Sequence, residues 1–128
     1  MDPIIRIPKP QIFQAEWRHK VANGDPHPLD IEKETYELVW VMRFYVGSLM
    51  AHSIRFSYTP GEWSEDEKEI LYEHMKYPRV QWAIDNSFDG LYIKRQEEMA
   101  EARMIYDIGA YLKSEQATFW RLKFSGTP

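Results

Sequence analysis

The residues that could do acid–base or metal chemistry in this chain are its four histidines and a few closely spaced carboxylates. Glu16 and His19 are three positions apart, the spacing at which one helix gives two ligands to a di-iron bundle site. Such a site needs this pair twice, and the chain has it once. Two further carboxylate pairs are four positions apart, Glu69 with Glu73 and Glu97 with Glu101. Both lie in stretches rich in other charges, so the sequence predicts neither a metal site nor a bound cofactor.

His52 lies in the most apolar part of the chain, where a hydrogen-bonded core histidine is more common than a catalyst. The chain has no cysteine, which excludes a disulfide framework, a thiolate zinc site and a cysteine nucleophile. The sequence also lacks a glycine-rich phosphate loop and a nucleophile elbow. We therefore expect no catalytic residues, although a small enzyme whose site converges from distant positions is an alternative.

The longest apolar stretch runs from Tyr36 to Ile54, and the rest of the chain must be organised around it. Large apolar residues recur at helical spacing on two faces, which is typical of a central helix covered from both sides. A strand is the alternative, because Val39, Trp40 and Phe44 are good β-formers. The length of the stretch favours the helix, so we expect a central helix near residues 31–56.

Two further helices are predicted after this stretch. Ser64 and Glu67 have the spacing of a capping box, which predicts a helix near residues 65–76 that Pro78 stops. A packed connector is expected over 79–86, and a last helix near 89–121. The expected fold is therefore mainly α, a small bundle of about three to four helices over residues 15–124. An extended arm, 1–14, precedes it, and a frayed tail, 125–128, follows it.

The arm is predicted to dock on a protein surface. Pro3, Pro8 and Pro10 exclude a helix and favour polyproline or β-like geometry. The large apolar side chains of the arm need cover, either from their own domain or from a neighbouring chain. The predicted partner-binding residues of the arm are Ile4, Ile5, Ile7, Ile12 and Phe13. Trp17 and Arg43 of the body complete the predicted set.

Arg43 interrupts the central apolar stretch and needs an explanation of its own. We expect its head group to reach solvent or to pair with a carboxylate such as Glu37, and otherwise to make a polar contact in an interface. Five Trp, eight Tyr and six Phe give more ring surface than so small a core easily covers. Aromatic residues are enriched at the centres of interfaces, so an aromatic-rich surface is one reading and an aromatic-rich core is the other.

The formal charge of −4 disfavours a general nucleic-acid binder, which usually has a basic face. Up to Ala22 there are four basic residues against two acidic ones, so a mildly cationic arm is attached to an acidic body. Arg43 divides the longest candidate for a membrane span, and the prolines of the arm do not fit a secretory leader. We therefore expect a soluble, cytoplasmic protein with no membrane contact.

Together these features predict a non-enzymatic protein-interaction or structural subunit. It would be a small accessory, adaptor or viral-type assembly protein that binds a protein partner, or a second copy of itself, through the arm and an aromatic surface. A nucleic-acid-associated protein that uses the basic N-terminal segment is one alternative. A small enzyme is the other.

Overall fold

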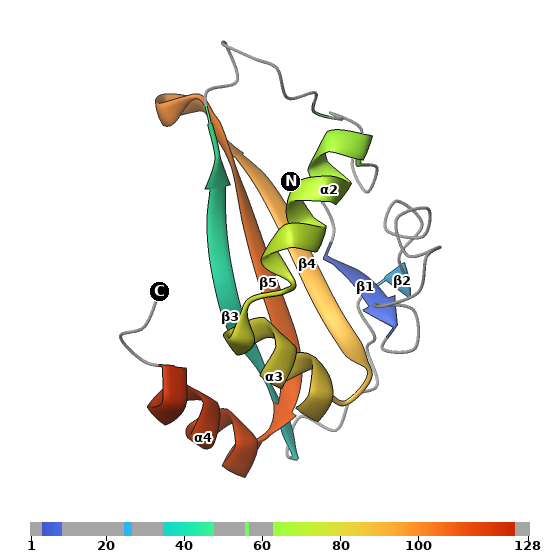
Figure 1. The fold of residues 1–128 in the computed structure, drawn as a ribbon, viewed down its shortest axis with the longest axis vertical. Helices are drawn as coiled ribbons and strands as arrows, with labels where there is room; N and C mark the ends of the chain where they lie inside the picture. The colour runs from blue at the N-terminus through green and yellow to red at the C-terminus, as the bar shows by residue number, and fades with distance from the viewer. Residues whose placement is uncertain (1–3, 9–24, 27–34, 48–55, 57–62, 125–128) are drawn as a thin grey trace.

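The computed structural model describes residues 4–8, 25–26, 35–47, 56 and 63–124. These residues form a five-stranded antiparallel sheet with three α-helices, so the prediction of a mainly α helical bundle was wrong. The elements are β1 (Ile5–Pro8), β2 (Asp25–Pro26), β3 (Tyr36–Val46), α2 (Glu65–His74), α3 (Pro78–Asn86), β4 (Gly90–Glu98), β5 (Arg103–Lys113) and α4 (Ser114–Phe124). The strand order is β2-β1-β4-β5-β3, which makes the long strand β3 one edge of the sheet (Figure 1).

The stretch that was expected to be the central helix is strand β3. It pairs antiparallel with β5 along its whole length, from Tyr36 opposite Lys113 to Val46 opposite Met104. A β-bulge between Trp40 and Met42 adds one residue to β3. The β-branched and aromatic residues of this stretch fit a pleated sheet that is covered on one side, so tertiary packing decided against the helix.

The long helix expected near 89–121 is also wrong over its first three quarters, residues 89–113. Strands β4 and β5 form a hairpin there, and only α4 is helical. A short 3-10 turn, Met99–Glu101, connects the two strands and ends at Ala102, whose φ of 51° lies in the left-handed region. The hairpin brings Glu98 opposite Arg103, so these two charges pair across strands and not along a helix face.

The helix predicted near 65–76 is confirmed as α2, because its start is specified locally. The Ser64 hydroxyl accepts a hydrogen bond from the Glu67 amide at 3.1 Å, and the Glu67 carboxylate accepts one from the Ser64 amide at 3.0 Å. This reciprocal pair satisfies two amides that the first turn leaves without helical partners. After α2, Pro78 occupies the first turn of α3, where a missing amide hydrogen costs nothing.

Helices α2, α3 and α4 pack against one face of the sheet (Figure 1). The apolar residues of β4 and β5 that point to this face, Leu91, Ile93, Ile108, Ala110 and Leu112, are fully buried. The core continues into the helices through Leu71, Val80, Ala83, Ile84 and Ala117. We call the opposite side of the sheet the outer face.

Part of the N-terminal arm is a strand of its own domain. Strand β1 pairs antiparallel with β4, with Ile5 opposite Ile93 and Pro8 opposite Gly90. The Ile7 side chain is buried in the main core. The structure therefore covers this part of the arm in cis, which the sequence had left open.

Candidate functional site

The residues predicted to bind a partner are not gathered in one place. Ile7 is in the main core, and Ile4 packs on the outer face against a second cluster formed by Tyr92 and Tyr111. Ile5 lies in β1, and Arg43 is exposed on the outer face. The remaining members of the predicted set, Ile12, Phe13 and Trp17, lie outside the described residues, as do Glu16, His19 and His52.

The strongest buried polar cluster joins α2 to the sheet. Glu67 Oε2 accepts hydrogen bonds from Arg95 Nη1 at 2.9 Å and from the Tyr106 hydroxyl at 2.6 Å. The side chains of Glu67 and Arg95 are 0% and 2% exposed, and the guanidinium of Arg95 lies over the ring of Trp63. Because solvent and ligands have no access to these groups, we assign the cluster to the fold and not to binding.

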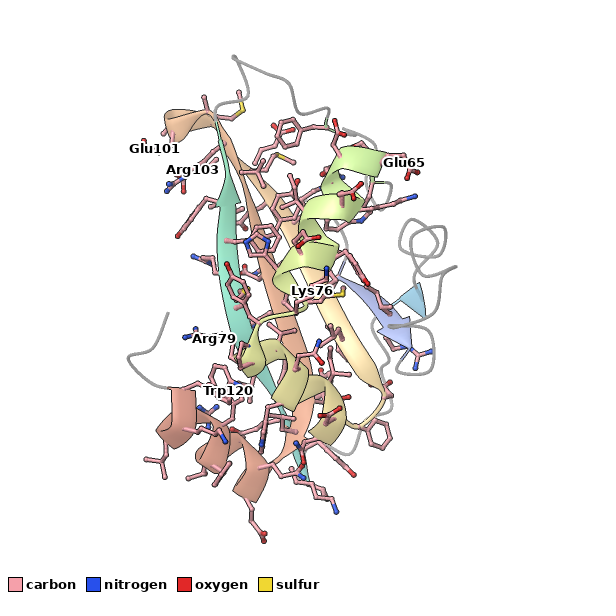
Figure 2. All side chains as sticks on the ribbon, viewed as in Figure 1. Glu65, Lys76, Arg79, Glu101, Arg103 and Trp120 are labelled. Carbon is pink, nitrogen blue, oxygen red and sulfur yellow. The ribbon has the colours of Figure 1, made fainter. Side chains whose placement is uncertain are left out.

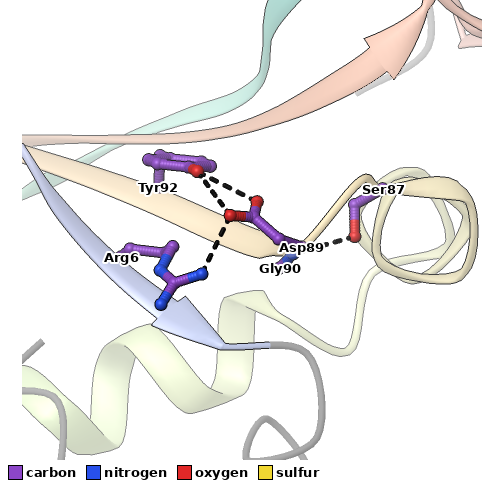
Figure 3. Close-up of polar contacts among 5 residues, drawn as sticks. All are labelled: Arg6, Ser87, Asp89, Gly90 and Tyr92. Carbon is purple, nitrogen blue, oxygen red and sulfur yellow. Dashed lines mark hydrogen bonds and ion pairs between the residues drawn. The ribbon is translucent and has the colours of Figure 1, made fainter. Parts of the chain in front are cut away.

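Another polar cluster, formed by Arg6, Asp89 and Tyr92, lies between β1 and β4. The Tyr92 hydroxyl is 2.9 Å from both carboxylate oxygens of Asp89, and Arg6 Nη1 donates to the same carboxylate at 2.9 Å (Figure 3). Ser87 Oγ accepts a hydrogen bond from the Gly90 amide at the start of β4. Burial and the Asp89 carboxylate raise the pKa of Tyr92 well above its ordinary value, because both favour the neutral phenol.

This pKa shift predicts a loss of stability at alkaline pH. A tyrosine whose pKa is higher in the folded than in the unfolded chain stabilises the fold below pH 10, and this contribution is lost as pH rises further. We expect the free energy of unfolding to fall above pH 10, by about 1.4 kcal/mol per pH unit for Tyr92 alone. Urea unfolding between pH 8 and 11 measures this slope. Tyr92→Phe should make it shallower, and an unchanged slope would contradict the assignment.

On the outer face, Arg43 pairs with a carboxylate, as expected, but the partner is Asp107 and not Glu37. Its Nε and Nη2 donate to the two Asp107 oxygens at 2.7 and 3.1 Å, while Lys94 Nζ lies 3.9 Å from the same carboxylate. Asp107 is buried, whereas the Arg43 side chain is 51% exposed. The bond to Asp107 raises the pKa of Arg43, and the nearby Tyr45 adds to this shift. A fixed guanidinium is therefore presented to solvent.

Trp40 lies beside this ion pair, on the backbone of β5. Gly109 is directly opposite it, and a Cβ at Gly109 would come within 2.7 Å of Trp40 Cε3. The indole therefore rests in the space that the missing side chain leaves. Lys94 Nζ lies 5.1 Å from the ring centroid, and Trp40 is 37% exposed. These contacts hold a large aromatic group in one orientation without burying it.

Tyr45 completes the same surface near the end of β3. The guanidinium of Arg103 lies 4.0 Å from the centroid of its ring, and Arg103 Nε donates to Glu98 at 2.8 Å. Tyr45 is 48% exposed. In Figure 2, Arg103 lies beside the carboxyl end of β3, at the end of the sheet away from Trp120.

We define the outer-face cluster by four of these residues, Trp40, Arg43, Tyr45 and Arg103. All four are partly exposed, and each is held by a neighbour in the sheet. Trp, Tyr and Arg are the residue types that carry most binding energy in protein interfaces. Their preorganisation matters because a side chain that is already fixed loses little freedom when a partner binds.

The sequence singled out one member of the cluster, Arg43, and missed the other three. Trp40 and Tyr45 were assigned to a central helix near residues 31–56, and Arg103 to a last helix near 89–121. All residues from Leu38 to Met42 are apolar, so no alternation of polar and apolar residues marked Trp40 as exposed. Within the described residues no group of three or more histidines and carboxylates is placed to hold a metal ion.

Helices of the described ranges are too short and too polar to cross a membrane. Comparison of the chain with protein-family models, curated proteins and solved structures found no match.

Proposed function

We propose that this chain is a non-enzymatic interaction subunit that binds a protein partner through the outer-face cluster. The observation that carries the proposal is the arrangement of Trp40, Tyr45 and Arg43, two aromatic groups and a guanidinium, which are half exposed yet fixed by Gly109, Arg103 and Asp107. Such anchors, surrounded by less critical contacts, are what alanine scans find at the centres of interfaces.

Three buried or partly buried carboxylates of the described residues support a non-enzymatic role. Glu67, Asp89 and Asp107 each hold a neighbouring strand or helix through charge-assisted hydrogen bonds. A catalytic acid or base needs access to its substrate, which Glu67 does not have. The chemistry of these carboxylates is therefore accounted for by the fold.

A single-stranded nucleic acid is the competing partner, because aromatic platforms with nearby cations also bind bases and phosphates. On the outer face, however, Arg43 and Lys94 share Asp107, and Arg103 pairs with Glu98. Three cations against two carboxylates leave only a weak positive charge. Binding of a phosphate backbone depends on many cations whose counterions it releases, so a protein partner fits this face better.

The proposal predicts that peptides selected from a random displayed library bind at Trp40. Trp40→Ala should weaken the selected peptides by at least about 30-fold, the effect of losing one interface hot spot. Phe119→Ala is the matched control, because Phe119 is an aromatic residue of α4 that is 51% exposed and packs on Trp82 away from the cluster. Fluorescence anisotropy measures both affinities, and circular dichroism checks that both variants fold.

Two outcomes would contradict the proposal. Equal losses in Trp40→Ala and Phe119→Ala would show that the peptides do not bind at the cluster. If no peptide is selected and a fluorescent oligonucleotide binds with strong salt dependence, the nucleic-acid reading replaces the protein reading.

A further inference from the structure

Next to the outer-face cluster, the sheet ends at β3, which pairs with another described strand on one side alone. Strand β3 is the last in the order β2-β1-β4-β5-β3, and among the described strands only β5 pairs with it. An edge strand of eleven residues presents a row of donors and acceptors that another strand can satisfy. Natural proteins usually protect such an edge, or use it.

The two halves of this edge differ. Near its beginning, β3 is flanked by α4, where Arg121 Nη1 lies 2.6 Å from Glu37 Oε1. The bulge between Trp40 and Met42 then interrupts the regular strand. Beyond the bulge, Met42–Val46 is regular, and Figure 1 shows no described helix or strand beside the edge of β3 that faces away from β5. A pairing strand is therefore limited to these five residues.

The sequence Met42–Val46 is complementary to itself. If two copies pair antiparallel about Phe44, Arg43 of one chain lies opposite Tyr45 of the other, and Met42 lies opposite Val46. Both Arg43–Tyr45 pairs are on the outer face, where a guanidinium beside a phenol ring is a favourable cation–π contact. On the other face, Met42 and Val46 are apolar and continue the core.

The contacts of Phe44 on the helix-covered face of the sheet also agree with a pairing of two chains about this residue. The ring of Phe44 stacks on His74 with a centroid distance of 3.8 Å, and Tyr77 lies next to His74. Tyr77 is 47% exposed. A half-exposed aromatic residue therefore lies next to the ring that stacks on Phe44.

From this self-complementarity we infer that two copies of the chain associate through β3 into a symmetric dimer with one continuous sheet. The inference rests on the proposed function, since it names a second copy of this chain as one protein partner. The dimer joins the two outer-face clusters into one surface, and two-fold dimers are the commonest protein assemblies.

Charge substitutions at Tyr45 test the pairing. Tyr45→Lys places two like charges opposite each other at both Arg43–Tyr45 pairs, and Tyr45→Glu places opposite charges there. Both variants lose the same ring over Arg103, so they form a matched pair. In sedimentation velocity we expect twice the monomer mass for the wild type and for Tyr45→Glu, and the monomer mass for Tyr45→Lys.

Disulfide trapping tests the register, because the chain has no cysteine of its own. Opposite Cα atoms of an antiparallel pair are about 4.5–5.5 Å apart, within reach of a disulfide. A mixture of Arg43→Cys and Tyr45→Cys should therefore form a covalent dimer under mild oxidation. Either variant alone should not, because equivalent positions are then diagonal and about 7–8 Å apart.

Three results would overturn the dimer. These are a monomeric wild type at all concentrations, a Tyr45→Lys variant as dimeric as Tyr45→Glu, and single variants that cross-link as well as their mixture. A monomeric wild type would not contradict the peptide-binding proposal. That proposal is tested by the peptide affinity of Trp40→Ala and not by the mass of the protein.

Discussion

Replacing Glu67 by Ala should cost the fold about 3–5 kcal/mol, the usual effect of removing one partner of a buried ion pair. The variant leaves Arg95 charged and buried, removes the acceptor of the Tyr106 hydroxyl, and breaks the capping box of α2. Since domains of this size are stable by about 5–15 kcal/mol, the variant would lose a large fraction of its total stability. Urea unfolding followed by circular dichroism measures the loss.

Two matched variants separate the causes. Glu65 lies in the same first turn but its side chain is 74% exposed, so Glu65→Ala should change stability by no more than about 0.5 kcal/mol. Adding Arg95→Met to Glu67→Ala should recover much of the loss, because an apolar replacement removes the unpaired charge. Equal losses for Glu65→Ala and Glu67→Ala would show that the buried carboxylate does not hold the fold.

Gly109→Ala is the second large effect, and we expect it to cost about 1–3 kcal/mol through overpacking. The added Cβ would lie 2.7 Å from Trp40 Cε3 and 3.1 Å from Leu38 Cδ1, so the indole has to leave its place on β5. In a Trp40→Ala background the indole is absent, so Gly109→Ala should lower the free energy of unfolding by less. Thermal or urea unfolding of the four proteins gives the coupling energy directly.

Additive effects in this cycle would contradict the contact. The expected coupling also bears on function, because Gly109→Ala should weaken peptide binding without touching an exposed atom of the outer-face cluster. A variant that keeps both its stability and its peptide affinity would show that Trp40 is not positioned by Gly109.

The bulge in β3 explains why the sequence pattern there was misread. Before the bulge, Leu38 and Trp40 lie on the outer face at a spacing of two, and after it Arg43 and Tyr45 do the same. The extra residue makes the step from Trp40 to Arg43 three. The break removed the regular alternation that marks a strand. Because almost every position of the stretch is apolar, stripes at steps of three and four could also be drawn through it, and these favoured a helix.

The β4–β5 hairpin was missed for a different reason. Its turn consists of Met99, Ala100, Glu101 and Ala102, which are good helix formers, and lacks the Asn-Gly or Asp-Gly signal of a tight turn. Lys94 and Glu98, and Arg103 and Asp107, then happened to have helical spacing. The pairs that the structure contains, such as Lys94 with Asp107, depend on the register of two strands.

What could be predicted was local. The start of α2 follows from two residues three apart, and both of its hydrogen bonds are present. Arg43 was recognised as unusual, but its partner Asp107 is 64 residues away, and no short-range pattern indicates such a contact. The outer-face cluster could not be predicted for the same reason. Each of its members is held by a residue of a different strand.

The pairing of β1 with β4 has a consequence for how the chain reaches this structure. Arg6 and Asp89 are 83 residues apart, so β1 cannot join the sheet until nearly three quarters of the chain is available. In the described sheet, β4 and β5 are joined by one short turn. The pairs β3–β5 and β1–β4 are each separated by long segments of the chain. We therefore expect the β4–β5 hairpin to form early, with β3 and β1 added later across long loops, and such non-local pairing makes folding slow. During synthesis Ile4 and Ile7 leave the ribosome long before the residues that cover them, so β1 is a segment that a chaperone has a long time to bind.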